Sequence, residues 1–319
     1  MSIQFSAAFT MNDRLKTDPT QQTTFIHKTT REFSLEPKDR SMNFRYRDCF
    51  ICVVALVTTG TDCHTARAEH EGKVQILLLG DSTTEGSVPR RHVPKGPHLE
   101  DVIRELLAAE KELPPTNVIN LGLSGEFIRR LLDSGRYDKE AAKLPGVDYV
   151  LVRYGLNDNA RRENFAENFP TDYHELIGRL KTDHPNATLI VMTVIPYGDE
   201  ATCLRINQLN EAVAKAEGLT LFDIYPRYAA ELKRGPDMLN YRRFPLEKIP
   251  ENRREFVKPF VVGSVNSTVE VLDNRLDAHF GHLPGWFGDR HPNLAGYHVI
   301  GDETAKFLAP LMHAKLTKP

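Results

Sequence analysis

Two short segments of the 319-residue chain contain the residue types needed for nucleophilic attack on an acyl group. Residues 80–86 (GDSTTEG) place Ser82 among turn-forming residues, where a serine hydroxyl can be exposed at the end of a strand. Residues 289–293 (DRHPN) place His291 close to Asp289. A neutral histidine can take the proton of a serine hydroxyl, and a carboxylate can fix its tautomer and stabilise the imidazolium. The two segments predict acyl transfer with Ser82 as nucleophile and His291 as base.

Two further clusters supply hydrogen-bond donors for a developing negative charge. Residues 120–125 (NLGLSG) contain glycines that let a backbone N–H approach an anion, and residues 155–158 (GLND) contain an asparagine amide that can donate to an oxyanion. Each string alone also fits an ordinary turn or helix cap. A phosphate-binding loop is excluded for residues 80–86, because no lysine follows the glycine-rich turn. Four such clusters in this order favour a single site.

Apolar runs and helical periodicity alternate along the chain and place the clusters at strand ends. We expect strands at Val74–Leu79, Asn117–Leu121, Asp148–Arg153, Thr188–Ile195 and Leu219–Asp223, and helices around Leu99–Leu113, Phe127–Leu132, Tyr173–Leu180, residues 203–217 and the segment capped by Asn293. Alternation of this kind predicts an α/β fold with βαβ units around a central parallel sheet of about five strands. Such sheets bind ligands at the carboxyl ends of their strands.

The four clusters resemble the signature blocks of the SGNH (GDSL-type) serine esterase superfamily, over roughly residues 73–313. The resemblance implies a three-layer, flavodoxin-like α/β/α fold with Ser82 as nucleophile and His291 as general base. It also implies an oxyanion hole formed by the N–H groups of Ser82 and Gly125 and the side chain of Asn157. No cofactor is implied.

The last block departs from the family pattern, which has an aspartate three residues before the histidine. That position is Gly288 here, and Asp289 stands two residues before His291. Residues two apart in an extended segment share a face, so Asp289 can orient the imidazole. The alternatives are Asp277, Asp302 or a serine–histidine dyad in which a backbone carbonyl steadies the histidine.

Histidines near the last block raise the question of a metal. His279 and His282 lie close to His291 and Asp289, which are residue types that bind zinc. No cysteine or HExxH-type helix supports such a site, so we expect no metal.

Two other features near the clusters have more than one interpretation. Arg90, Arg91 and Lys95 form a basic loop that is either a solvated turn or a contact for acidic sugars or phosphate head groups at the cleft rim. Trp286, the only tryptophan, either stacks on a sugar or packs in the core or at the rim.

The first 68 residues differ from the rest. Residues 1–41 are polar and show no periodicity, so we expect them to be disordered or a non-native extension upstream of a start at Met42. Residues 42–68 have a positive start, a short apolar middle and an A-x-A end, which is typical of a signal peptide cleaved after Ala68. These features predict a secreted or periplasmic protein. Only Cys203 follows the cut, so the mature fold does not rely on an internal disulfide.

Length and charge are consistent with one hydrolase domain over residues 69–319. A net charge of −2 without a basic stripe argues against nucleic acid as a partner, and the apolar run of residues 49–57 is too short to span a bilayer. Residues 235–288 are rich in proline and break the alternation, so we expect a long, irregular insertion that forms a lid or a substrate wall.

Together these features predict a secreted serine esterase that acts on small-molecule or polysaccharide esters, with a carbohydrate O-acetylesterase as the leading function. The alternatives are a lipase, lysophospholipase or thioesterase on the same residues, and a carbohydrate-binding relative whose triad has decayed.

Overall fold

The computed structural model describes residues 72–235 and 238–317. The expected extension (residues 1–41), the signal peptide (residues 42–68) and the cleavage after Ala68 therefore lie outside the described residues. Within the two described ranges, no helix is both long enough and apolar enough to cross a membrane.

A five-stranded parallel sheet forms the centre of the fold, in the order β2-β1-β3-β4-β5. The strands are β1 (Val74–Gly80), β2 (Thr116–Asn120), β3 (Val147–Arg153), β4 (Thr188–Met192) and β5 (Thr220–Phe222). Residues 75–80 of β1 are fully buried, as a central strand covered on both faces must be. The predicted α/β fold and its five strands are confirmed, although β4 ends at Met192 rather than Ile195.

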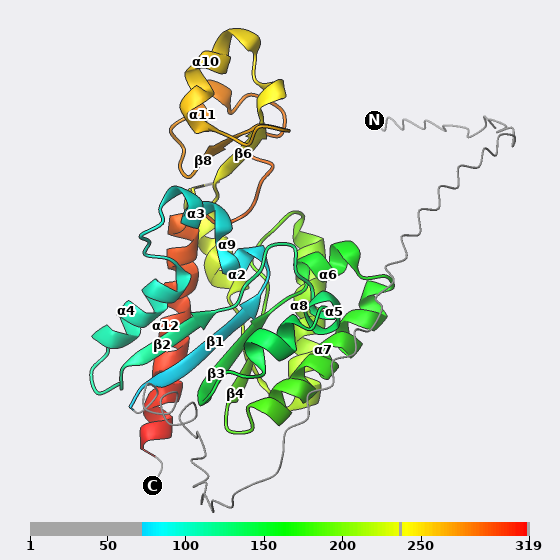
Figure 1. The fold of residues 1–319 in the computed structure, drawn as a ribbon, viewed down its shortest axis with the longest axis vertical. Coiled ribbons are helices and arrows are strands. Elements are labelled where there is room, and N and C mark those ends of the chain that lie inside the picture. The colour runs from blue at the N-terminus through cyan, green and yellow to red at the C-terminus, as the bar shows by residue number, and fades with distance from the viewer. Residues whose placement is uncertain (1–71, 236–237, 318–319) are drawn as a thin grey trace, which may run out of the picture. The chain divides into compact units, whose positions relative to one another are not determined.

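Helices cover both faces of this sheet and make three layers (Figure 1). Alternate strand residues, such as Ile76 and Leu78 against Leu77 and Leu79, enter two separate apolar clusters. The first cluster includes α4 (Leu99–Ala109), α9 (Tyr225–Arg234) and α12 (Leu294–Leu316), and the second includes α5 (Ile128–Asp133), a π-helix (Tyr137–Ala141), α7 (Phe165–Asp183) and α8 (Glu200–Glu217). The predicted cap of the last helix is confirmed, since the Asn293 side chain accepts a hydrogen bond from the Gly296 N–H.

Several short helices were not expected from the sequence. They are α2 (Ser82–Glu85), α3 (Ser87–His92) and α6 (Leu156–Arg161), together with the π-helix and α9. Helices of one to three turns contain too few apolar positions for a periodic pattern to stand out. Three of these helices carry polar clusters singled out above: α2 comes after β1, α3 follows α2, and α6 comes after β3.

The described part of the predicted irregular insertion, residues 238–288, is more ordered than expected. It contains a three-stranded antiparallel sheet in the order β6-β8-β7. The elements are β6 (Arg242–Pro245), β7 (Val261–Val262), β8 (Thr268–Val271), α10 (Arg254–Val257), α11 (Asp277–Phe280) and the 3₁₀ turns Leu246–Lys248, Glu251–Arg253 and Lys258–Phe260. This small sheet has an apolar cluster of its own, and Trp286 is 0 % exposed within it. The sugar-stacking interpretation of Trp286 is therefore wrong.

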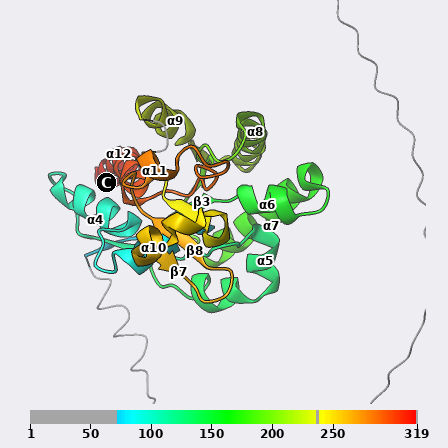
Figure 2. The ribbon, with the colours of Figure 1, turned by 90° about the horizontal axis from the view of Figure 1, so that it is seen from above.

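The small sheet lies beyond the carboxyl ends of the central strands, as the view from above shows (Figure 2). Glu270 of β8 accepts hydrogen bonds from Arg91 at 2.7 and 2.9 Å and contacts His92 at 3.0 Å, which ties β8 to α3. At the other side, the backbone N–H of Tyr241 donates to the carbonyl of His291 at 3.3 Å. The insertion is thus attached next to both Ser82 and His291.

Candidate active site

The predicted site residues gather where the direction of the chain connections reverses between β1 and β3. From β1 the chain continues to β2 on one side, and from β3 it continues to β4 on the other, which is the position where open α/β sheets bind ligands. A cavity of about 420 Å³ opens there and is lined by Ser82, Gly125, Asn157 and His291, with further residues from the small sheet. Four of the five predicted residues therefore line one cavity, and Asp289 contacts His291 beside it.

Ser82 is the first residue of α2, directly after the buried strand β1. The Asp81 carboxylate caps this helix by accepting hydrogen bonds from the Thr83 N–H at 2.8 Å and the Thr83 hydroxyl at 2.7 Å. Gly86 has a φ of +69° and ends the helix after four residues. The Ser82 side chain is therefore carried on a tight strand-to-helix turn, as the glycine-rich string predicted.

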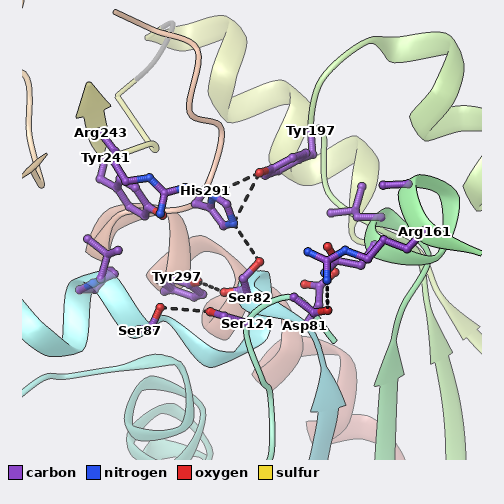
Figure 3. Close-up of a pocket in the computed structure, with 16 residues that line it drawn as sticks. Asp81, Ser82, Ser87, Ser124, Arg161, Tyr197, Tyr241, Arg243, His291 and Tyr297 are labelled. Carbon is purple, nitrogen blue, oxygen red and sulfur yellow. Dashed lines mark hydrogen bonds between the residues drawn. The ribbon is translucent and has the colours of Figure 1, made fainter. Parts of the chain in front are cut away.

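A chain of hydrogen bonds joins Ser82, His291 and Asp289. Ser82 Oγ lies 2.8 Å from His291 Nε2 (Figure 3). Asp289 Oδ1 lies 2.6 Å from His291 Nδ1. The same Oδ1 accepts a hydrogen bond from the His291 backbone N–H at 3.0 Å. This double contact shows how an aspartate two residues before the histidine can reach its ring.

The charge of Asp289 determines which nitrogen of His291 carries the proton. Burial raises the pKa of the Asp289 carboxyl, but its hydrogen bonds with His291 and the positive charges of His291 and Arg243 outweigh burial, so the pKa lies below its ordinary value. An ionised Asp289 accepts only, so Nδ1 of a neutral His291 must hold the proton. Nε2 is then free to accept the hydroxyl proton of Ser82.

The two alternative carboxylates of the sequence lie elsewhere. Asp277 makes a bidentate ion pair with buried Arg242, at 2.6 and 2.8 Å, and accepts a hydrogen bond from Trp286 Nε1. Asp302 is on α12 and pairs with Lys306 at 2.6 Å. Among the described residues, Asp289 is the carboxylate that contacts His291.

Two tyrosines that the sequence did not indicate surround the imidazole. Tyr241 stacks on His291 with an interplanar angle of 8°, and Tyr197 meets the ring edge-on, with its hydroxyl 3.2 Å from Nδ1. Burial raises the pKa of Tyr197 to about 12, so its hydroxyl stays protonated at neutral pH. Single aromatic residues in separate loops carry no pattern by which sequence analysis could have found them.

The glycine loop after β2 is fixed against α2. A Cβ atom at Gly122 would come within 2.5 Å of the Glu85 nitrogen, so only glycine allows this approach. The Glu85 carboxylate accepts a 2.7 Å hydrogen bond from the Ser124 N–H and another from the Ser124 hydroxyl. Gly125, the next residue, has a φ of +75°. The conformation of the loop that contains Gly125 therefore depends on Glu85, which sequence analysis missed.

Asn157 lies in the first turn of α6, directly after β3, and its neighbour Asp158 holds this region together. One Asp158 oxygen accepts from the Ile128 N–H and the other from the Gly155 N–H, each at 3.0 Å. The side chain is buried, and burial raises its pKa to about 7. Asp158 thus connects the start of α5, after the glycine loop, to the turn that carries Asn157.

The remaining basic and histidine features of the sequence are engaged elsewhere. Arg90 pairs with Glu100 at 2.6 Å and Arg91 with Glu270, so both arginines of the predicted basic loop are neutralised by carboxylates. The His279 ring packs against Phe256, with the ring centroids 4.9 Å apart. Within residues 72–235 and 238–317, no cluster of three or more histidine, cysteine or acidic side chains is arranged to hold a metal ion.

Comparison with protein families gives one match. The model described as "GDSL-like Lipase/Acylhydrolase family" matches residues 78–244, about half of the chain. This range contains Ser82, Gly125 and Asn157. No curated protein matches the sequence.

Solved structures with a similar arrangement share little sequence with this chain. Axe2, an acetylxylan esterase from Geobacillus stearothermophilus, has 16% identity and a TM-score of 0.46, with 73% of this chain and 93% of that chain covered. A putative GDSL-like lipase from Parabacteroides merdae has 14% identity and a TM-score of 0.47, with 75% and 96% covered. LAE5, an α/β hydrolase from the metagenome of Lake Arreo, has 19% identity and a TM-score of 0.46, with 74% and 96% covered.

The first prediction concerns the carboxylate beside the imidazole. Asp289→Asn should lower kcat on an ester substrate by about 10³–10⁴-fold, because an amide that donates to Nδ1 stabilises the wrong tautomer. Steady-state kinetics beside His291→Ala measures this. Turnover of Asp289→Asn equal to wild type, with His291→Ala inactive, would show that the serine and histidine act as a dyad.

The second prediction concerns the glycine loop. Glu85→Ala should lower kcat by about 10–100-fold with a smaller effect on KM, because a loop shift of about 1 Å misplaces the Gly125 N–H. Glu85→Gln should recover part of the loss, since its amide oxygen can still accept from Ser124. If both variants unfold at the wild-type temperature and turn over at the wild-type rate, Glu85 does not position the loop.

The third prediction follows from the raised pKa of Asp158. Between about pH 4 and pH 7 the folded protein retains a proton on Asp158 that the unfolded chain releases, so the free energy of unfolding falls as the pH rises. Relative to Asp158→Asn, wild type should lose up to about 1.4 kcal/mol per pH unit across this window. Denaturant unfolding of both proteins at several pH values measures the difference, and parallel pH profiles would contradict the assignment.

Proposed function

The chain belongs to the GDSL-like lipase/acylhydrolase family, and from this membership we propose that it is a carbohydrate O-acetylesterase with Ser82 as nucleophile. Hydrolysis of ester bonds is the chemistry of the family. The observation that supports the finer proposal is the set of polar side chains in the cavity beside Ser82 and His291, which lie next to apolar ones such as Val88 and Leu156. The polar side chains that line it include Ser87, Ser124, Asn157, Arg161, Tyr197 and Arg243.

A cavity of this size with a mixed polar and apolar lining suits an acetylated sugar better than a long acyl chain. Ligand cavities generally span about 300–1,000 Å³, and 420 Å³ lies at the lower end of that range. A fatty acyl chain needs an extended apolar wall, because each buried CH₂ contributes about 0.8 kcal/mol only in apolar surroundings. Sugar hydroxyls need hydrogen-bond partners when they leave water, and the lining residues offer them.

The proposed reaction begins with attack of Ser82 Oγ on the ester carbonyl carbon. As the new C–O bond forms, the hydroxyl proton passes to His291 Nε2, and Asp289 stabilises the resulting imidazolium. The carbonyl oxygen becomes an oxyanion that accepts hydrogen bonds from the Ser82 and Gly125 N–H groups and the Asn157 amide. Collapse of this intermediate breaks the bond to the sugar oxygen, which leaves with the proton from His291.

Water completes the cycle by hydrolysing the acyl-serine. His291 takes a proton from the water, the hydroxide adds to the acyl carbon, and the same donors hold the second oxyanion. The bond to Ser82 then breaks, the serine recovers its proton from His291, and acetic acid leaves and loses its proton to water. The 2.8 Å and 2.6 Å contacts of His291 support an intact hydrolase rather than a decayed binding relative. The secretion predicted from residues 42–68 remains a proposal that fits a polysaccharide substrate.

The fourth prediction tests the acyl specificity. In a panel of p-nitrophenyl esters, kcat/KM for acetate should exceed that for octanoate by at least about tenfold, because a short cavity leaves the longer chain in water. Ser82→Ala, measured on the same panel, sets the background rate. A preference for octanoate would favour a lipase or thioesterase acting through the same residues.

A further inference from the structure

Two arginines line the cavity, and they lie on opposite sides of Ser82 and His291 (Figure 3). Arg243 comes from β6 of the small sheet, and its guanidinium pairs with Asp289 Oδ2 at 2.8 Å. The charge of Arg243 is therefore balanced by a carboxylate that also contacts His291. Arg243 therefore lies on the side of the site where His291 acts as the base, and its charge is paired.

Arg161 differs, because no carboxylate of the described residues lies within ion-pair distance of its guanidinium. Its Nη1 donates to the Gly125 carbonyl at 3.0 Å, and its Nη2 lies 3.3 Å from the position that a Cβ of Gly125 would take. A guanidinium has five N–H donors and can bind a carboxylate through two of them. Arg161 is exposed, so most of its donors are accessible to a ligand in the cavity.

The position of Arg161 on α6 relates its charge to the ester. Asn157 and Arg161 are four residues apart on this helix, so they lie on one face, one turn from each other. A ligand oxygen held by Asn157 and an anionic group held by Arg161 would therefore be neighbours in one substrate.

The one acidic residue that lines the cavity does not offset this charge. Asp81 is 1 % exposed, and its carboxyl is occupied by the N–H and hydroxyl of Thr83. Burial also raises the pKa of Asp81 above its ordinary value, which disfavours its negative charge. Arg161 is thus a cation in the cavity lining whose guanidinium has no carboxylate partner among the described residues, whereas the Glu85 carboxylate on the same loop is engaged by Ser124.

We propose that Arg161 binds an oxyanion group of the substrate, so that the protein removes acetyl groups from acidic saccharides in preference to neutral ones. The inference rests on the proposed function and specifies its substrate class. A carboxylate and a phosphate both match a guanidinium, and the substrates below distinguish them.

The test compares three sugars that carry one acetyl group at the same hydroxyl. They are a methyl glucuronoside with a free carboxylate, its uncharged methyl ester, and a methyl glucoside 6-phosphate. Wild type should hydrolyse one or both anionic sugars with a kcat/KM about 10–100-fold above the uncharged ester, because hydrogen bonds to charged groups are the strong ones. Added salt should reduce this ratio.

Variants assign the preference to one side chain. Arg161→Gln should bring the ratio of kcat/KM on charged and uncharged sugars close to one. Arg161→Lys should retain part of the preference, since lysine keeps the charge but lacks the planar pair of N–H donors. Arg130→Gln is the matched control, because Arg130 also donates to the Gly125 carbonyl, at 3.4 Å, but does not line the cavity. The ratio should stay at the wild-type value in Arg130→Gln.

Two results would overturn the inference. One is equal hydrolysis of charged and uncharged sugars by wild type. The other is an Arg161→Gln variant that loses activity on all three sugars by the same factor, which would assign Arg161 to the support of the glycine loop. Failure of the proposed function looks different, because none of the sugar acetates would then be hydrolysed while longer acyl esters are.

Discussion

The hydrogen bond between Ser82 Oγ and His291 Nε2 joins two residues 209 positions apart, so it requires that β1 and α12 hold a fixed relative position. A second contact fixes the same pair of elements. The Tyr297 hydroxyl, on the first turns of α12, donates to the Ser82 carbonyl at 2.8 Å. A shift of α12 along the sheet would break both bonds together. α12 also buries an apolar face against the sheet. This packing and the two hydrogen bonds together set the distance between Ser82 Oγ and His291 Nε2, over which the proton passes.

The buried charge of Arg153, close to the turn that carries Ser82, lowers the free energy of unfolding. Arg153 at the end of β3 is 2 % exposed, and its Nη2 donates to the Thr83 carbonyl and, at 3.1 Å, to Thr84 Oγ1. Its Nε and Nη1 have no hydrogen-bond partner among the described residues, and burial lowers its pKa. An apolar residue of similar volume would avoid that desolvation cost. Arg153 therefore exchanges stability for two contacts that hold α2, the turn on which Ser82 stands, much as strained functional sites do in general.

The parts of the fold that depend on patterns of apolar residues along the chain were predictable. Buried central strands appear as continuous apolar runs, and the chemistry lies at their carboxyl ends, so the positions of Ser82 and Asn157 followed from the sequence. Contacts between loops were not predictable, because no periodicity encodes them. Glu85 reaches Ser124 across 39 positions, and Tyr241 reaches His291 from an insertion with no recognisable pattern. Arg161 is intermediate. Its spacing of four from Asn157 would have indicated a shared face if the short helix α6 had been recognised.

The insertion of residues 235–288 does more than bound the cavity. The start of the insertion also contacts the segment that carries the catalytic base, His291. Asn240 and Pro292 form an antiparallel bridge, so the start of the insertion is paired directly with the segment that holds His291. From there Tyr241 stacks on the imidazole and Arg243 occupies Asp289 Oδ2, which leaves Oδ1 to His291. The ion pair from the small sheet therefore holds one oxygen of the Asp289 carboxylate while His291 engages the other. Through Arg243 and Tyr241 the small sheet takes part in orienting the imidazole as well as in lining the cavity.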